Sequence, residues 1–264
     1  MESPTDKLIA RKQGAIGWIV FNQPQKHNAV SYEMWQALPV LLDMLAKDEE
    51  IRVVILKGEG EKAFISGADI SQFGEKRSSA EAVLEYNAAS DRAGKALQEF
   101  PKPILAMIRG YCVGGGVAVA VGCDVRIAAD DTRYAIPAGK LGLGYRFSGV
   151  ERLADLIGPS FTAEIFYTAR QFDAQEALQM GLVNRVLPAA ELERYTVDYA
   201  NTIAGNAPLT LFSIKRNLIE WHKDPARRDL ALAQKLVDDC YASADYKEGR
   251  TAFMEKRKPQ FRGR

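Results

Sequence analysis

The chain has 264 residues, of which 47% are hydrophobic and 26% charged, a composition ordinary for a globular protein with a sizeable core. Its net charge of +1 gives no electrostatic argument for binding nucleic acid or an acidic membrane surface. The three cysteines are too few and too irregularly spaced for a disulfide framework, so we expect a reducing, cytoplasmic compartment. Residues 1–13 lack the apolar core of a signal peptide, and no apolar run has the length of a membrane span.

Strands and helices alternate along most of the chain, and helices alone follow. Apolar runs predict strands over residues 15–22, 53–56, 104–109, 125–128 and 183–187. Apolar periodicity predicts helices over residues 31–45, 78–100, 117–121, 150–157, 160–168, 173–181, 192–204, 209–221, 226–242 and 245–256. Ser78 with Glu81 and Asp173 with Glu176 have the spacing of capping boxes. We therefore expect an α/β core over residues 1–190 and a helical C-terminal region over residues 191–264.

A strand that runs into three glycines forms the centre of the chain. The strand over residues 104–109 is followed by Gly114, Gly115 and Gly116, and then by the small apolar helix over residues 117–121. Glycines let another group approach the backbone closely, and the first N–H groups of a helix have no intrahelical partner. Such donors suit an anion or a developing oxyanion. A tight turn that only packs a helix against a sheet explains the glycine triplet equally well.

A second glycine turn, Ser66-Gly67-Ala68-Asp69, also follows a predicted strand. If the two strands are neighbours in one sheet, one N–H from each turn could hold a single oxygen at the sheet edge. The sequence contains no P-loop, no dinucleotide-binding fingerprint, no nucleophile elbow and no cluster of metal-ligand type. We therefore expect a site made mostly of backbone donors and a few polar side chains, with no metal and no cofactor of its own.

Five segments, in order and spacing, resemble the crotonase (enoyl-CoA hydratase/isomerase) family from about residue 10 to the C-terminus. They are Lys26-His27-Asn28-Ala29, Ile65-Ser66-Gly67-Ala68-Asp69-Ile70, Phe100-Pro101-Lys102-Pro103-Ile104, Gly110-Tyr111-Cys112-Val113-Gly114-Gly115-Gly116 and Phe253-Met254-Glu255-Lys256-Arg257. The resemblance implies a spiral core of ββα turns and a helical C-terminal region that drives trimerisation, often as a dimer of trimers. It also implies an acyl-CoA thioester substrate whose oxygen lies in an oxyanion hole made by the N–H groups of Ala68 and Gly115.

The resemblance also places the CoA part of the substrate. It implies contacts with Lys26, Ala29, Ser66, Gly67, Ala68, Asp69, Ile70 and Gly115 of one subunit, and with Phe253 and Lys256 of a neighbouring subunit. Without the resemblance, Lys26 and Lys256 would be taken as solvated surface lysines, and Asp69 as an anchor of its own turn. Coenzyme A is thus expected as part of the substrate.

The chain departs from the family where typical hydratases have two glutamates. Ala118 and Ala138 occupy those positions. Adding water across a C=C bond needs a base to activate the water and an acid to protonate the α-carbon, and alanine can do neither. The usual hydratase mechanism, and isomerisation through the second glutamate, are therefore not available at these two positions.

Decarboxylation forms a thioester enolate without removing a proton, so an oxyanion hole and a proton donor suffice. The loop over residues 141–149 is similar to that of the family's methylmalonyl-CoA decarboxylases and includes Tyr145, the candidate donor; Ala68, however, replaces a histidine common in that subgroup. The neighbouring Arg146 could bind a substrate carboxylate or form a surface ion pair. Our first hypothesis is a lyase that decarboxylates a methylmalonyl-like CoA thioester.

Two alternatives stay open. The protein could be an enoyl-CoA hydratase or isomerase that takes its acid/base group from Glu81, Glu85 or Tyr145. It could also be a non-catalytic subunit that binds acyl-CoA, because a binding pocket can outlast its glutamates.

Overall fold

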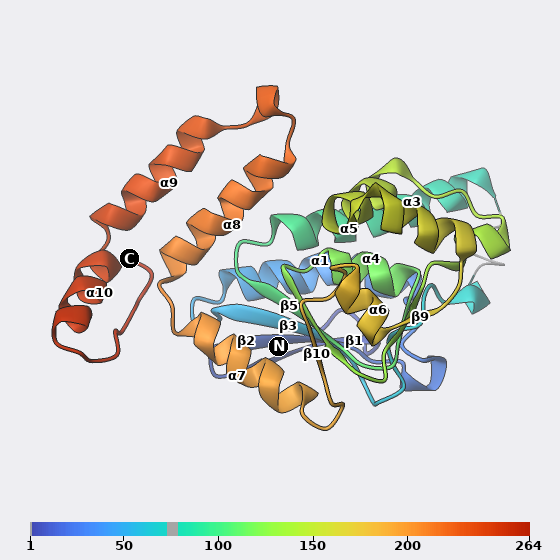
Figure 1. Cartoon of the computed structure of the whole chain (residues 1–264), viewed down its shortest axis with the longest axis horizontal. Coiled ribbons are helices and arrows are strands. Elements are labelled where there is room, and N and C mark those ends of the chain that lie inside the picture. Colours follow the sequence, from blue (N-terminus) through green and yellow to red (C-terminus); the bar gives the residue numbers. More distant parts are fainter. Residues whose placement is uncertain (1, 73–78) are drawn as a thin grey trace.

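Two mixed sheets form the core of the computed structural model, which describes residues 2–72 and 79–264 (Figure 1). The large sheet has the strand order β1-β2-β3-β5-β7-β10, and the small sheet the order β4-β6-β8-β9. The strands of the large sheet are β1 (Leu8–Gln13), β2 (Ile16–Phe21), β3 (Val53–Gly58), β5 (Ile104–Ile108), β7 (Val125–Ala129) and β10 (Arg185–Leu187). Those of the small sheet are β4 (Ala63–Ile65), β6 (Tyr111–Val113), β8 (Arg133–Ala135) and β9 (Phe172–Asp173).

The chain passes repeatedly from the large sheet to the small sheet and then into a helix. The helices are α1 (Tyr32–Lys47), α3 (Ala80–Glu99), α4 (Gly115–Val121), α5 (Phe147–Thr168), α6 (Ala174–Gln179), α7 (Leu192–Ala204), α8 (Pro208–His222), α9 (Leu230–Ala242) and α10 (Ala244–Met254). Thus β3-β4-α3, β5-β6-α4 and β7-β8-α5 are successive ββα units, and each strand pairs in parallel with its equivalent in the next unit. The expected ββα repetition is confirmed.

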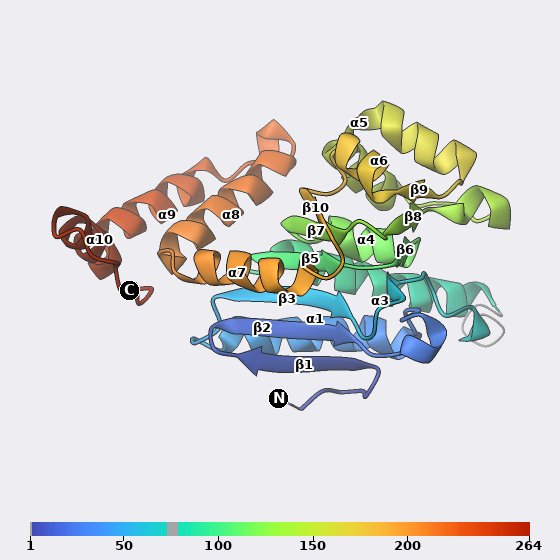
Figure 2. The same ribbon diagram turned by 60° about the horizontal axis from the view of Figure 1, so that its bottom comes forward.

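Alternate residues of the central strands pack on opposite faces of the large sheet. Val54 and Leu56 of β3 belong to a large cluster with α1, α3, α4 and α5, whereas Val53 and Ile55 belong to a smaller cluster under α7. Figure 2 shows α7 across the large sheet. Both faces of the parallel strands are covered, which explains why these strands are continuously apolar.

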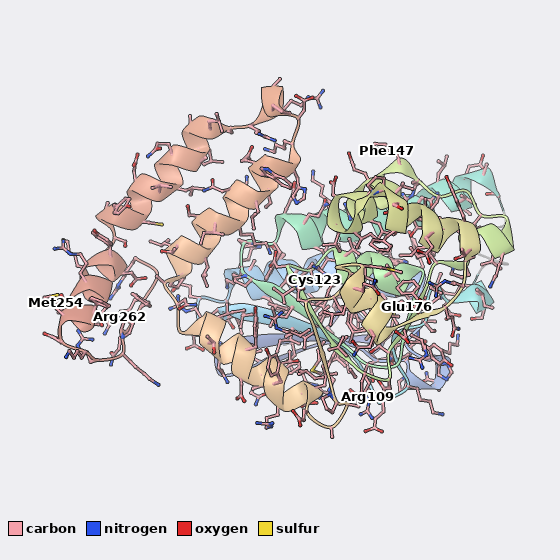
Figure 3. All side chains as sticks on the ribbon, viewed as in Figure 1. Arg109, Cys123, Phe147, Glu176, Met254 and Arg262 are labelled. Carbon is pink, nitrogen blue, oxygen red and sulfur yellow. The ribbon has the colours of Figure 1, made fainter. Side chains whose placement is uncertain are left out.

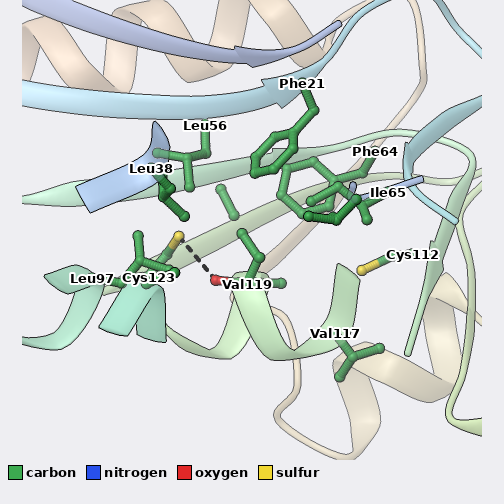
Figure 4. Close-up of a cluster of buried hydrophobic side chains, with 14 of the residues drawn as sticks. Phe21, Leu38, Leu56, Phe64, Ile65, Leu97, Cys112, Val117, Val119 and Cys123 are labelled. Atoms are coloured by element: carbon green, nitrogen blue, oxygen red, sulfur yellow. Dashed lines mark hydrogen bonds between the residues drawn. The ribbon is translucent and has the colours of Figure 1, made fainter. Parts of the chain in front are cut away.

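Cys112 and Cys123 are buried in the large cluster, as expected for small core residues (Figure 4). The thiol of Cys123 donates a hydrogen bond to the carbonyl oxygen of Val119 at 3.4 Å. Burial raises the pKa of Cys123 to about 12 and raises that of Cys112 as well. Neither thiol is therefore available as a nucleophile.

Several predicted boundaries were wrong. The polar N-terminal segment, for which no strand was predicted, forms the edge strand β1. Only alternate residues in the first half of this strand face the core, so the segment has no continuous apolar run. Helix α3 is capped by Ser79, whose hydroxyl accepts from the Ala82 amide, whereas Ser78 lies outside the described residues. The break expected at Gly158 is confirmed, since this residue is non-helical (φ = +79°) and divides α5 into two helical parts. Helix α9 begins later than expected because Pro225–Arg227 forms a separate 3₁₀ turn.

Helices α8, α9 and α10 form an arm that projects from the core (Figures 1 and 2). The buried Lys215 of α8 joins the arm to the core, since its ammonium donates to the Lys102 carbonyl at 2.8 Å and to Asp124 Oδ2 at 2.9 Å. Within the described parts of the chain, no helix has the length and apolar character needed to cross a bilayer. The division of the chain at residue 190 stays a prediction.

Candidate active site

The two glycine turns lie side by side, as the sequence predicted. The turn over residues 66–69 follows β4, the turn over residues 114–116 follows β6, and these strands pair in parallel in the small sheet. The strands that precede the turns are therefore the short β4 and β6, not the longer runs over residues 53–56 and 104–109. Three-residue strands are too short to show a periodicity, which is why neither was among the predicted strands.

The backbones of the two turns lie close enough for one added methyl group to fill the space between them. A Cβ atom placed on Gly114 would lie 3.9 Å from the Cα of Gly67, and one on Gly115 would lie 3.9 Å from the amide nitrogen of Ala68, both ordinary van der Waals distances. Gly67 has φ = +121° and Gly114 has φ = +52°, and side chains rarely tolerate these values. The backbone conformation thus calls for glycine at both positions.

Gly116 brings α4 against the end of β4. A Cβ atom on this residue would overlap the carbonyl oxygen of Ile65 and lie 3.0 Å from the Ile65 Cβ. On the other side of the turn, the nearest neighbour of a Cβ on Gly115 would be the ring of Trp35, at an ordinary 3.5 Å. A methyl group would therefore fit at Gly115, whereas the packing of α4 requires glycine at position 116.

The amides of Ala68 and Gly115 are available to a ligand. In the bridge to Val30, the bonds run from Val30 N to Gly67 O and from Asp69 N to Val30 O, so the bridge does not use the Ala68 amide. Gly115 is the first residue of α4, a position whose amide has no intrahelical acceptor. Neither amide makes a hydrogen bond to any residue that the structure describes. Two unused donors at adjacent turns can hold one oxyanion.

Asp69 anchors its turn, as expected from the residues alone. Its carboxylate accepts from Lys26 Nζ at 2.8 Å, from Ser71 Oγ at 2.6 Å and from the Ser71 amide at 3.1 Å. Burial by itself would raise the pKa of Asp69, but the bonds from Lys26 and Ser71 outweigh it and hold the pKa below its ordinary value. Lys26 is therefore an exposed lysine that is paired with the turn through Asp69.

Asn28 organises the same loop, and the sequence analysis missed its role. It lies in the left-handed region (φ = +55°) and is fully buried. Its side chain accepts from the Gln23 amide at 3.0 Å and donates to the carbonyls of Glu59 at 2.9 Å and Ala63 at 2.8 Å. The signal in the sequence was an asparagine in a loop, because asparagine adopts the left-handed conformation more readily than most residues.

The remaining residues expected to contact CoA in one subunit border these turns. The Ser66 hydroxyl lies 3.4 Å from the Lys26 carbonyl, Ala29 is buried, and Ile70 is exposed over 72% of its surface. Phe253 and Lys256 lie apart from them, on the surface at the end of α10, where Figure 3 labels Met254. One subunit therefore does not bring these two residues to its own turns.

Tyr145 is packed in the loop that follows β8. Its ring meets the Phe166 ring edge-on, with centroids 4.6 Å apart, and covers Gly149. Burial raises the pKa of Tyr145, so the phenol stays protonated at neutral pH. Arg146 pairs with Asp91 of α3 and donates to the Asn87 carbonyl at 3.2 Å. Of the two roles considered for Arg146, the structure supports the surface ion pair.

The alanines in place of glutamates carry no acid or base. Ala118 is exposed on α4, one turn beyond Gly115, and Ala138 is buried in the 3₁₀ turn Pro137–Leu141. The hydroxyl of Tyr32 donates to Glu85 Oε1 at 2.7 Å. Hydrogen bonds from the Glu81 amide and Ser79 hold the pKa of Glu81 below its ordinary value, which makes it a weak base.

Glu85 is connected to the glycine turns through Tyr86, the next residue of α3. The indole of Trp35, which lies beside Gly115, donates to the Tyr86 hydroxyl at 3.0 Å. Tyr86 in turn stacks on Tyr32, with ring centroids 6.2 Å apart. The carboxylate of Glu85 thus belongs to a group of side chains that begins at the Gly115 backbone.

A family model described as enoyl-CoA hydratase/isomerase matches residues 11–264. The chain is 31% identical to the short-chain-enoyl-CoA hydratase of Clostridium acetobutylicum, over 96% of this chain and 96% of that protein. It is also 31% identical to the crotonyl-CoA hydratase of Syntrophomonas wolfei, over 97% and 98%. Among solved structures, an enoyl-CoA hydratase/carnithine racemase from Magnetospirillum magneticum has a TM-score of 0.93 at 33% identity, covering 99% of this chain and 97% of that chain. The similarity extends over the α/β core and the C-terminal helices.

Proposed function

Because the chain belongs to the enoyl-CoA hydratase/isomerase family, we propose that the amides of Ala68 and Gly115 bind the carbonyl oxygen of an acyl-CoA thioester. The fold is the α/β crotonase fold with C-terminal helices. The observation that carries the proposal is the position of the two turns at the ends of paired strands, each with a backbone amide that has no acceptor among the described residues. Two such donors stabilise an enolate oxygen by about 3 kcal/mol or more each.

The comparisons bear on the choice between hydration and decarboxylation. The relatives reported above are named as enoyl-CoA hydratases, and they do not support the closer resemblance to methylmalonyl-CoA decarboxylases. Arg146, the cation beside Tyr145, is paired with Asp91 at the surface, and nothing in its contacts favours a role in binding a substrate carboxylate. Hydration or isomerisation of an enoyl-CoA is therefore the reaction that we propose first.

This reaction needs an acid and a base outside positions 118 and 138. The protonated Tyr145 is the candidate acid for the α-carbon, and Glu85 is the candidate base because its carboxylate belongs to the group of side chains that begins at Gly115. Decarboxylation stays as a second candidate, favoured by Ala118 and Ala138, since loss of CO2 needs a proton donor but no base.

A paired assay distinguishes the two reactions. We expect the purified protein to hydrate crotonyl-CoA, followed as loss of the enoyl absorbance, and to release no CO2 from methylmalonyl-CoA. Tyr145→Phe and Glu85→Gln should each lower kcat for hydration by at least about tenfold, or roughly 1.4 kcal/mol, with little change in CoA binding. Release of CO2 without hydration would instead establish the decarboxylase. Binding of both esters without turnover would establish the non-catalytic alternative for these two acyl groups.

We further propose that the arm assembles the protein into a homotrimer or a dimer of trimers. Ile214, Leu218 and Trp221 recur on one face of α8 and are each exposed over more than half of their surface. Trp221 also lines a groove of about 470 Å³ between α8 and α9. An exposed apolar surface of this kind is typical of a protein–protein interface. In such an assembly Phe253 and Lys256 would reach the CoA of a neighbouring subunit.

A charge on this face should break the assembly. We expect Leu218→Glu to convert the oligomer to monomers in sedimentation velocity, because the glutamate would have to be desolvated at the interface. The side chain is exposed in the monomer, so far-UV circular dichroism should not change. Leu178→Glu on α6 is the matched control and should leave the mass unchanged. A wild-type protein that sediments as a monomer would contradict the proposal.

A further inference from the structure

Arg126 is a buried cation that no step of the proposed reaction uses. It is the second residue of β7 and only 4% exposed. Its guanidinium donates from Nη1 to the Cys123 carbonyl at 2.6 Å, and from Nε to the Leu182 carbonyl at 2.8 Å. Longer contacts run from Nη1 to the Ala120 carbonyl at 3.5 Å and from Nη2 to Asn184 Oδ1 at 3.4 Å. These acceptors compensate for the loss of water around the charge.

Ala120 lies in the last turn of α4, and Cys123 lies two residues beyond its end. The Ala120 carbonyl also accepts from the Cys123 amide at 3.1 Å, so the shorter bond of Arg126, to the Cys123 carbonyl, holds the turn that directly follows the helix. A cation at this end is favoured by the helix dipole, and through Leu182 the guanidinium also ties this turn to the segment before β10. Because this segment and β7 belong to the core, the guanidinium fixes the end of α4 relative to the large sheet.

Helix α4 is short: Val117, Val119 and Ala120 pack into the large cluster along its length, and Gly116 and Arg126 make contacts at its two ends. Its seven residues span about 10 Å, and their side chains are hydrogen, methyl or isopropyl groups. At the N-terminal end, Gly116 lies against the Ile65 carbonyl, which sets the height of the Gly115 amide above β4. A helix of this length moves as a rigid unit, so a shift at the Arg126 end displaces the Gly115 amide as well.

We propose that Arg126 is a positioning residue that holds the Gly115 amide in register with the Ala68 amide. The inference rests on the proposed function, because it assumes that these two amides bind the thioester oxygen. Hydrogen bonds to an oxyanion depend steeply on placement, and a displacement of about 1 Å can cost on the order of 10²-fold in rate. Arg126 thus acts on the reaction through α4 without touching the substrate.

The test measures polarisation of the thioester directly. A conjugated probe, hexadienoyl-CoA, shifts its absorption to longer wavelength when donors pull electron density toward its carbonyl oxygen. We expect Arg126→Met to lose at least about half of the wild-type shift at saturating protein, with CoA affinity changed less than threefold. Arg126→Lys keeps the charge, but its single ammonium cannot reach the Cys123 and Leu182 carbonyls together. This variant should therefore fold more readily than Arg126→Met and still lose part of the shift.

Ile55→Ala is the matched control for a loss of stability. Ile55 is fully buried in the cluster under α7, on the opposite face of the large sheet from α4, and the variant should melt earlier by a comparable amount. It should retain the full spectral shift. Retention of the full shift by both Arg126 variants, or an equal loss in Ile55→Ala, would overturn the positioning role. If the wild-type protein binds the probe without any shift, it is the proposed oxyanion site that fails.

Discussion

Replacing Gly115 by proline should lower kcat/KM by two to three orders of magnitude, or about 3–4 kcal/mol in the transition state. Proline removes the N–H that we assign to the thioester oxygen and leaves the neighbouring backbone bonds in place. Gly115 is the first residue of α4, a position where proline is well tolerated because the amide has no intrahelical acceptor. The preceding Gly114 keeps its amide bond to the Ala135 carbonyl at 2.8 Å.

Gly115→Ala is the matched control for this change. Alanine keeps the N–H, and its Cβ would make an ordinary contact of 3.5 Å with the Trp35 ring. We expect the alanine variant to stay within about threefold of the wild-type kcat/KM, and both variants to unfold at similar temperatures. The hexadienoyl-CoA shift should survive in Gly115→Ala and collapse in Gly115→Pro. A proline variant with wild-type turnover would show that the Gly115 amide does not bind the reacting oxygen.

Gly116→Ala should destabilise the fold by about 3 kcal/mol or more, although it adds a single methyl group. The methyl would overlap the Ile65 carbonyl oxygen, a backbone atom that cannot rotate away as a side chain does. Helix α4 must then separate from β4, and this movement displaces the Gly115 amide as well. The variant should therefore lose both thermal stability and activity in the fraction that remains folded.

The comparison between adjacent glycines makes this result specific. Gly115→Ala introduces the same methyl group one residue earlier, where it would lie at an ordinary 3.5 Å from the Trp35 ring. This variant should melt within about 2 °C of the wild type. Denaturant unfolding of the two variants, followed by circular dichroism, measures the difference in free energy of unfolding. Equal stabilities would contradict the close approach of α4 to β4.

Both predictions concern backbone atoms, and this reflects the chemistry of the site. With alanine at positions 118 and 138, and with Asp69 already paired with Lys26, we assign the binding of the reacting oxygen to the pair of unused amides. Such donors are fixed by the fold and need no reorganisation when charge develops on a bound oxygen. The identity of the proton-handling groups is therefore a separate question, which the Tyr145 and Glu85 variants address.

The sequence by itself determined the features that depend on local chemistry. Consecutive glycines indicated a close backbone approach, alternating apolar runs indicated the α/β core, and Asp69 was correctly expected to anchor its turn. The family followed from short motifs in the right order. Each of these inferences needs only neighbouring residues, because glycine conformations, caps and hydrophobic periodicity are set within a few positions along the chain.

Only the tertiary structure decided which groups meet across long stretches of sequence. It paired Arg146 with Asp91 at the surface, and it placed Arg126 against Leu182 at the end of α4. It also showed that the short strands β4 and β6 carry the two turns. The paired residues are 47 to 56 positions apart in the sequence, and the strands β4 and β6 have three residues each. Hydrophobic periodicity along the chain does not predict such contacts, because they are set by the packing of the ββα units against one another.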